Sequence, residues 1–151
     1  MRILVISDSH GRNDDVKGVL EQVGEIDMLI HCGDVERGDQ YIRDIAGCPV
    51  VMVAGNNDYY LDLPSEETIE VEGYRIWVTH GHPYYVNSGV DYLREYGEMH
   101  DVDVVMYGHT HVPFIEIGDD MTILNPGSIS YPRQALSLIH ISEPTRLDVI
   151  S

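Results

Sequence analysis

Three short apolar runs near the start of the chain are each followed by polar residues, and helical patterns lie between them. RILVIS (2–7), MLIHC (28–32) and VVMVA (50–54) are nearly continuous aliphatic runs of the length of buried strands. DDVKGVLEQV (14–23) places its valines and leucine on one helical face, and QYIRDIA (40–46) indicates a second helix. Strands that alternate with helices predict parallel βαβ units.

The second half of the chain changes to an alternating pattern. TIEVEGYRIWVT (68–79) and FIEIGDDMTILN (114–125) alternate apolar and polar positions around a central turn, which is typical of antiparallel hairpins. Between them, GVDYLREYGEMH (89–100) predicts a helix and DVVMY (103–107) a strand. The whole pattern predicts an α/β fold with mixed sheets.

Composition narrows the class of protein. A chain of 151 residues has the length of one domain, and it holds no apolar stretch near the roughly 20 residues that span a membrane. Nine Lys and Arg against 26 Asp and Glu give a net charge of −17, which argues against nucleic-acid binding. The start MRILVISDSH carries no export signal, and Cys32 and Cys48 are too few for a disulfide framework. We therefore expect a cytoplasmic protein that binds neither nucleic acid nor membrane; a homo-oligomer is left open.

Polar residues with metal-binding side chains follow the predicted strands. Open α/β sheets bind ligands at the carboxyl ends of their strands, so we expect these residues to converge. Each one alone is more typical of a turn, a helix cap or a locally satisfied histidine. Together, their oxygen and imidazole donors suit Mn²⁺, Fe, Ni²⁺ or Zn²⁺ better than Ca²⁺, and they exceed the needs of one ion, which indicates two ions about 3.5–4 Å apart. The set comprises Asp8, His10, Asp34, Asn56, Asn57, Asp58, His80, His82, His109 and His111.

Five motifs occur in a characteristic order: DSH (8–10), GD (33–34), GNND (55–58), HGH (80–82) and GHTH (108–111). In this order they resemble the calcineurin-like metallophosphoesterase superfamily. The short chain with PGSISYPR near its end is similar to the small prokaryotic phosphodiesterase branch. The resemblance implies two mixed β-sheets packed as a sandwich and flanked by helices (αββα). Whether the C-terminal strands of this fold are complete in the chain is left open.

The same resemblance implies a metal centre. It assigns Asp8, His10 and His111 to a first ion, Asn56, His80 and His109 to a second, and Asp34 to a bridging position. Strand alternation predicts that His109 and His111 point the same way, one toward each ion. The implied enzyme is a dinuclear metal-dependent phosphodiesterase that hydrolyses small phosphodiesters by direct attack of a metal-bridging hydroxide, with manganese as the favoured metal and nickel, iron or zinc as alternatives.

Other functions of the same fold are weighed against this one. A protein-interaction scaffold and a phosphomonoesterase are left open, although every expected ligand position holds a competent residue. A nuclease is disfavoured by the net charge of −17.

The catalytic candidates are His82, Asn57 and Asp58. Many members of the superfamily read GNHD where this chain has GNND, and the amide of Asn57 cannot deliver a proton to a leaving group. His82 is expected either beside the substrate phosphate or at the rim, and Asp58 is expected to orient its loop or a neighbouring imidazole. His31 and His100 fall outside the ligand set.

The end of the chain departs from the family pattern. We expect a single domain over residues 1–134. ALSLIHIS (135–142) is left open as a strand, but SLIHISEPTR, within residues 135–151, resembles a conceptual translation of a sequencing adapter more than a fold element. Residues 135–151 are therefore predicted to be a non-native tail in which His140 has no role.

Overall fold

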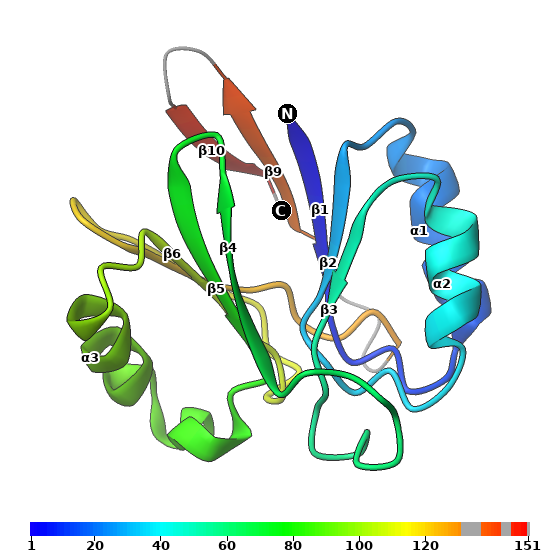
Figure 1. Ribbon diagram of the computed structural model, residues 1–151, viewed down its shortest axis with the longest axis horizontal. Helices are drawn as coiled ribbons and strands as arrows, with labels where there is room; N and C mark the ends of the chain where they lie inside the picture. Colours follow the sequence, from blue (N-terminus) through cyan, green and yellow to red (C-terminus); the bar gives the residue numbers. More distant parts are fainter. Residues whose placement is uncertain (131–136, 143–145, 151) are drawn as a thin grey trace.

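The computed structural model describes residues 1–130, 137–142 and 146–150, with side chains for residues 1–130. Two β-sheets face each other, and helices cover the outer face of each sheet (Figure 1). The α/β fold with mixed sheets that the pattern predicts is confirmed, and so is the sandwich flanked by helices that the family resemblance implies.

The first sheet is built on three parallel strands joined by helical connections. Its neighbouring strands β1, β2 and β3 pair in parallel, and α1 and α2 contact each other on its outer face. The bounds are β1 (Arg2–Ile6), α1 (Asn13–Val23), β2 (Met28–His31), α2 (Asp39–Ala46) and β3 (Val50–Met52). The predicted βαβ units therefore form as expected.

The second sheet contains both predicted hairpins. Its strand order is β4-β5-β6-β8-β7, in which β5, β6 and β8 are parallel while β4 and β7 are antiparallel to their neighbours. Its elements are β4 (Glu66–Val71), β5 (Tyr74–Thr79), the 3-10 helices η1 (His82–Tyr84) and η2 (Val86–Ser88), α3 (Asp91–Met99), β6 (Val104–Met106), β7 (Phe114–Ile117) and β8 (Thr122–Asn125).

Two C-terminal strands extend the first sheet beyond β1. The backbone of β9 (Ser137–Ser142) pairs antiparallel with β1, and β10 (Arg146–Ile150) pairs antiparallel with β9. Residues 131–136, 143–145 and 151 lie outside the described part of the chain, and so does the end of the PGSISYPR motif. The domain boundary at residue 134 and the non-native origin of residues 135–151 stay predictions.

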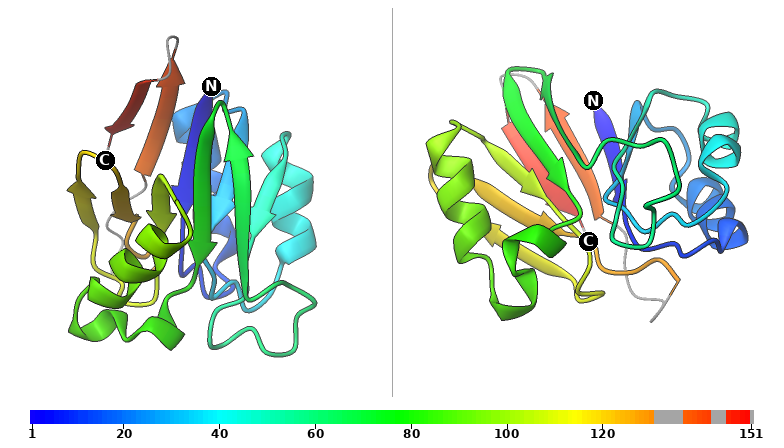
Figure 2. Two further views of the ribbon diagram at one scale, coloured as in Figure 1. Left: turned by 60° about the vertical axis from the view of Figure 1, so that its left-hand side comes forward. Right: turned by 60° about the horizontal axis from the view of Figure 1, so that its bottom comes forward.

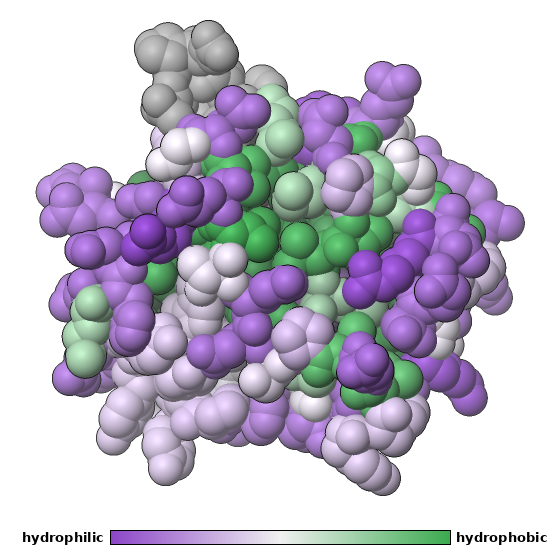
Figure 3. Space-filling view, viewed as in Figure 1, coloured by the Kyte–Doolittle hydropathy of each residue, from purple (hydrophilic) through white to green (hydrophobic). Residues whose placement is uncertain are grey.

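Alternating side chains of the apolar strands build separate layers of core. Ile3 and Val5 of β1 point between the two sheets, whereas Leu4 and Ile6 pack under α1 and α2. A third layer lies between the second sheet and α3, around Trp77. In the view of Figure 3, hydrophobic residues gather over the space between the sheets and hydrophilic residues surround them. Strands buried on both faces explain why their sequences are continuously apolar.

The parallel strands of both sheets end at one edge of the sandwich. The loops that follow β1, β2, β3, β5 and β6 meet there, at the bottom of Figure 1 and nearer the viewer in the right-hand view of Figure 2. Within the described residues, every helix is too short or too polar to cross a membrane.

Candidate metal centre

Asp8, Asp34 and His80 form the floor of a cluster at this edge. Each follows the end of a different strand, and all three are buried. The Nε2 atom of His80 lies 3.3 Å from Asp34 Oδ2 and 3.8 Å from Asp8 Oδ1. One ligand atom from each residue lies within 4.8 Å of the others, so the three could hold a metal ion.

A second group shares Asp8 and stands above this floor. His111 Nε2 lies 3.2 Å from Asp8 Oδ1, and His10 Nε2 lies 3.7 Å from the same oxygen. The two imidazole Nε2 atoms are 3.1 Å apart, and both rings are partly exposed. Asp8, His10 and His111 are the residues that the resemblance assigns to the first ion, and they also could hold a metal ion.

The remaining predicted residues line the rim. His109 Nδ1 lies 3.1 Å from Asn56 Oδ1, and the rings of His109 and His80 have centroids 5.1 Å apart. The ring of His82 lies 5.5 Å from that of His80 and is exposed to solvent. All seven predicted ligands therefore come together, while their individual roles stay predictions.

The prediction that strand alternation points His109 and His111 the same way is wrong. Strand β6 ends at Met106, so neither histidine belongs to a strand. Both adopt left-handed backbone conformations, with φ of 72° and 61°. His111 turns toward Asp8 and His10, and His109 turns toward Asn56. Loop geometry, rather than strand alternation, sends them to different parts of the cluster.

Left-handed backbone is concentrated at the site. L residues other than glycine rarely adopt positive φ, and such strain gathers where function requires a fixed geometry. Six of the nine such residues among those described lie in the cluster: Asp8, His10, Asp34, Glu36, His109 and His111. The loops are thus held in conformations that local preference alone would disfavour.

Two buried atoms of the floor lack hydrogen-bond partners. Among the described residues, Asp8 Oδ1 and His80 Nε2 are both buried and unsatisfied. The Nδ1 atom of His80 lies 2.8 Å from the carbonyl oxygen of Cys32, so Nδ1–H donates to it and the Nε2 lone pair is directed at the carboxylates. A buried carboxylate oxygen facing an imidazole lone pair is unfavourable without a cation between them. The residues present therefore fit a bound metal ion.

The electrostatics of the floor also favour positive charge. Burial would raise the pKa of Asp34, but the contact with His80 and two hydrogen bonds from Asn57 outweigh it and hold that pKa well below its ordinary value. Burial would lower the pKa of His80, but Asp34 and Asp8 outweigh it and raise that pKa. Burial raises the pKa of Asp8. The cluster stabilises a cation, whether a proton or a metal ion.

Supporting residues come from a segment distant in sequence. Ser128 and Ser130 each donate a hydrogen bond to the backbone carbonyl of Asp8, at 2.9 and 2.8 Å. Asn125 donates through Nδ2 to the carbonyl of Gly108, at 3.1 Å. These contacts brace the loops after β1 and β6. The sequence analysis noted this segment only as part of the PGSISYPR motif, and the motif alone did not show that its serines hold the loop of Asp8 in place.

Asn57 and Asp58 make hydrogen bonds to different parts of the site. Asn57 donates to both oxygens of Asp34, from its backbone N–H at 3.0 Å and from Nδ2 at 3.1 Å. Asp58 is fully buried and accepts backbone hydrogen bonds from Val35, Glu36 and Gly55. Asp58 therefore links the loops after β2 and β3 by hydrogen bonds, and its predicted role in orienting a loop or an imidazole stays a prediction.

His31 and His100 lie outside the cluster, as expected. His31 is buried; its Nδ1 accepts from the N–H of Gly33 at 3.2 Å, so its Nε2–H donates to Ser9 Oγ at 2.9 Å. Burial, together with the charge of His80, lowers the pKa of His31 to about 3. His100 is exposed and stacks on Tyr96, with ring centroids 4.1 Å apart. Both ring nitrogens of His31 thus have protein partners, and Nδ1 of His100 lies 3.0 Å from the carbonyl oxygen of Tyr96.

Two glycines allow the loops to approach closely. Gly33 has a φ of +106°, and a Cβ there would lie 2.6 Å from His80 Nδ1. A Cβ on Gly55 would lie 2.2 Å from Asp34 Oδ1, although Gly55 is absent from the residues with positive φ. Gly55 is thus required for space rather than for a sharp turn.

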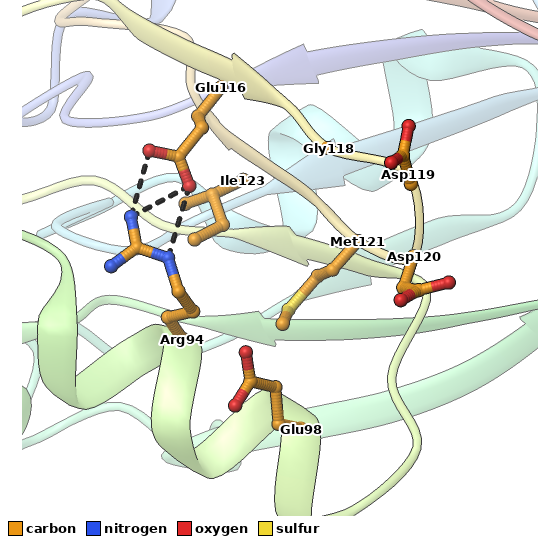
Figure 4. Close-up of a pocket in the computed structure, with 8 residues that line it drawn as sticks. All are labelled: Arg94, Glu98, Glu116, Gly118, Asp119, Asp120, Met121 and Ile123. Carbon is orange, nitrogen blue, oxygen red and sulfur yellow. Dashed lines mark hydrogen bonds and ion pairs between the residues drawn. The ribbon is translucent and has the colours of Figure 1, made fainter.

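A separate hollow of about 360 Å³ lies between α3 and the β7–β8 turn, and it shares no residue with the cluster (Figure 4). Arg94 is the cation among its lining residues. It is held by Glu116 at 2.7 Å and by Asp91 at 3.0 Å. The other charged residues that line the hollow are the three carboxylates Glu98, Asp119 and Asp120, so the hollow offers no free cation for an anionic ligand.

Comparison with known proteins shows which family the chain resembles in sequence and in fold. The model of the calcineurin-like phosphoesterase superfamily domain matches residues 1–143. A probable metallophosphoesterase of Methanocaldococcus jannaschii is 40% identical over 154 residues, covering 98% of this chain and 79% of that protein. A phosphodiesterase of the same organism is 28% identical over 145 residues, covering 84% and 83%. The crystal structure of a predicted phosphoesterase from Streptococcus pneumoniae superimposes with a TM-score of 0.81 at 31% identity, covering 99% of this chain and 88% of that one.

Proposed function

The chain belongs to the calcineurin-like phosphoesterase superfamily and is a metal-dependent phosphoesterase, and from this premise we propose that it is a dinuclear phosphodiesterase acting on small phosphodiesters. Manganese is the first choice of metal, and the donor set also suits nickel, iron or zinc. The cytoplasm remains its expected location. The proposed ligands are Asp8, His10, Asp34, Asn56, His80, His109 and His111.

The observation that carries this proposal is the pair of unsatisfied buried atoms, Asp8 Oδ1 and His80 Nε2, 3.8 Å apart. When bound, two divalent ions supply a water molecule of lowered pKa and neutralise the oxygens of a phosphate. The protein would position the ions and the phosphate. Buried Asp34 keeps its negative charge for the ions, and exposed His82 stands at the rim within reach of an incoming phosphate. Asn57 holds Asp34 in place by two hydrogen bonds.

The rim of the cluster supports a small substrate. Asn56 and His82 are exposed, so the reacting group enters directly from solvent. The net charge of −17 repels long polyanions, which favours small diesters over nucleic acids. The intact set of donor residues favours an enzyme over a binding scaffold of the same fold.

Metal reconstitution tests the proposal. The protein is stripped with a chelator and loaded with Mn²⁺; its metal content and its hydrolysis of bis(p-nitrophenyl) phosphate and p-nitrophenyl phosphate are then measured. We expect close to two ions per chain and faster hydrolysis of the diester. One tightly bound ion with full activity would contradict the dinuclear scheme, and a preference for the monoester would contradict the substrate class.

Two substitutions separate metal binding from substrate contact. Asp34→Asn should lose metal, because it removes the charge that offsets repulsion between two cations, whereas His82→Ala should retain it. Asp119→Asn makes the same chemical change at an exposed position of the β7–β8 turn and should behave as the unaltered protein. Loss of metal from the His82 variant but not from the Asp34 variant would show that the roles are wrongly distributed.

A further inference from the structure

Glu36, which none of the sequence motifs singled out, lies beside His10. Its carboxylate contacts Nδ1 of the His10 ring. A carboxylate accepts hydrogen bonds, so the proton of the neutral imidazole resides on Nδ1. The other nitrogen, Nε2, then presents its lone pair toward His111 and Asp8, at 3.1 and 3.7 Å.

The backbone of Glu36 is held in the conformation that makes this contact. Its φ is +65°, which is unfavourable for a residue with a Cβ. Its N–H donates to Asp58 Oδ1 at 2.6 Å, and its carbonyl oxygen accepts a hydrogen bond from the hydroxyl of Tyr60. Asp58 and Tyr60 both belong to the loop after β3, so a second loop aims Glu36 at His10.

We propose that Glu36 is a positioning residue that fixes the tautomer and orientation of His10, and thereby strengthens metal binding by Asp8, His10 and His111. The inference rests on the proposed function in taking a metal ion as the ligand of this group. A carboxylate behind a metal-binding histidine orients the ring and raises its basicity. Glu36 acts through His10 and does not itself contact the ion.

The tautomer of His10 gives a test that needs no metal. The ¹⁵N chemical shifts of its two ring nitrogens are measured in the metal-free protein at a pH where the imidazole is neutral. Glu36→Gly removes the carboxylate and accepts the left-handed backbone without penalty, so the variant is expected to fold. Glu36→Gln keeps an oxygen that can accept from Nδ1–H. We expect the Nδ1–H form to dominate in the unaltered and Gln proteins and a mixture of tautomers in the Gly variant.

Metal affinity gives the second readout. The Glu36→Gly variant should bind Mn²⁺ about 10- to 100-fold more weakly, with substantial recovery in Glu36→Gln. Glu72→Gly is a matched control, because Glu72 is an exposed glutamate with a φ of 50° in the β4–β5 turn, and its affinity should be unchanged.

Several results would overturn the inference. They are an unchanged His10 tautomer in Glu36→Gly, unchanged Mn²⁺ affinity in that variant, or an equal loss in Glu72→Gly. Failure of the unaltered protein to bind any of Mn²⁺, Ni²⁺, Fe²⁺ and Zn²⁺ would instead refute the proposed function, and the tautomer measurement would still decide the role of Glu36.

Discussion

Replacing Asp58 with alanine would remove the acceptor of three backbone N–H groups at once. Asp58 is fully buried; its Oδ2 accepts from Val35 at 3.0 Å and from Gly55 at 2.9 Å, and its Oδ1 accepts from Glu36 at 2.6 Å. A hydrogen bond to a charged group contributes about 1.5–3 kcal/mol. Water reaching the partly exposed Glu36 loop offsets part of the loss, so we expect a decrease of about 3–5 kcal/mol in the free energy of unfolding, as for a broken buried charge network.

Asp58→Asn should be milder, because one amide oxygen can still accept the two bonds now made by Oδ2. Its expected cost is about 1–3 kcal/mol.

For a chain of this length each kcal/mol lowers Tm by about 2–4 °C, so the alanine variant should melt roughly 10 °C lower.

The assay is urea unfolding followed by circular dichroism, with a chelator present so that metal binding does not mask the difference. Asp62→Ala, at an exposed aspartate further along the same loop, is the control and should stay within about 0.5 kcal/mol of the unaltered protein. A loss below about 1 kcal/mol in Asp58→Ala would refute the three-bond account. So would equal losses in the alanine and asparagine variants.

Three further predictions follow from the site. Asn57→His should flatten the dependence of kcat/KM on leaving-group pKa across aryl and alkyl phosphodiesters, since side-chain proton donation contributes about 10²- to 10⁴-fold; a shallow dependence in the unaltered protein would contradict this. Gly108→Ala should weaken Mn²⁺ binding measured by calorimetry about tenfold or more, because its Cβ would lie 2.6 Å from Asp8 Oδ2. Gly18→Ala, which meets open space, should bind normally, and equal binding by both variants would refute the steric argument. Because His31 is buried and neutral, the free energy of unfolding should fall by about 1.4 kcal/mol for each pH unit from pH 6.5 down to about 3, where only the unfolded chain takes up the proton. The free energies are measured by urea unfolding, and the same pH slope in His31→Gln would disprove this account.

The pattern of the sequence was sufficient to predict an α/β fold with mixed sheets and the convergence of the site, whereas the two-sheet sandwich was implied by the family resemblance. Strands buried on both faces must be apolar at every position, as in residues 2–7, and a strand with one exposed face alternates, as in residues 68–71, whereas residues 76–79 of β5 are all buried. Because the carboxyl ends of parallel strands meet at one edge, the residues that follow them could be placed together without coordinates. These are consequences of local periodicity, which a single sequence displays directly.

The tertiary structure alone decided how the site residues face one another. The contact of Glu36 with His10, the hydrogen bonds of Asn57 to Asp34 and those of Ser128 to Asp8 join loops from different strands. The directions of His109 and His111 depend on left-handed backbone that a pattern of strand alternation does not contain. Such conformations are unfavourable for each loop in isolation and persist only because contacts with the other loops hold them, so the geometry of the site is a property of the assembled fold.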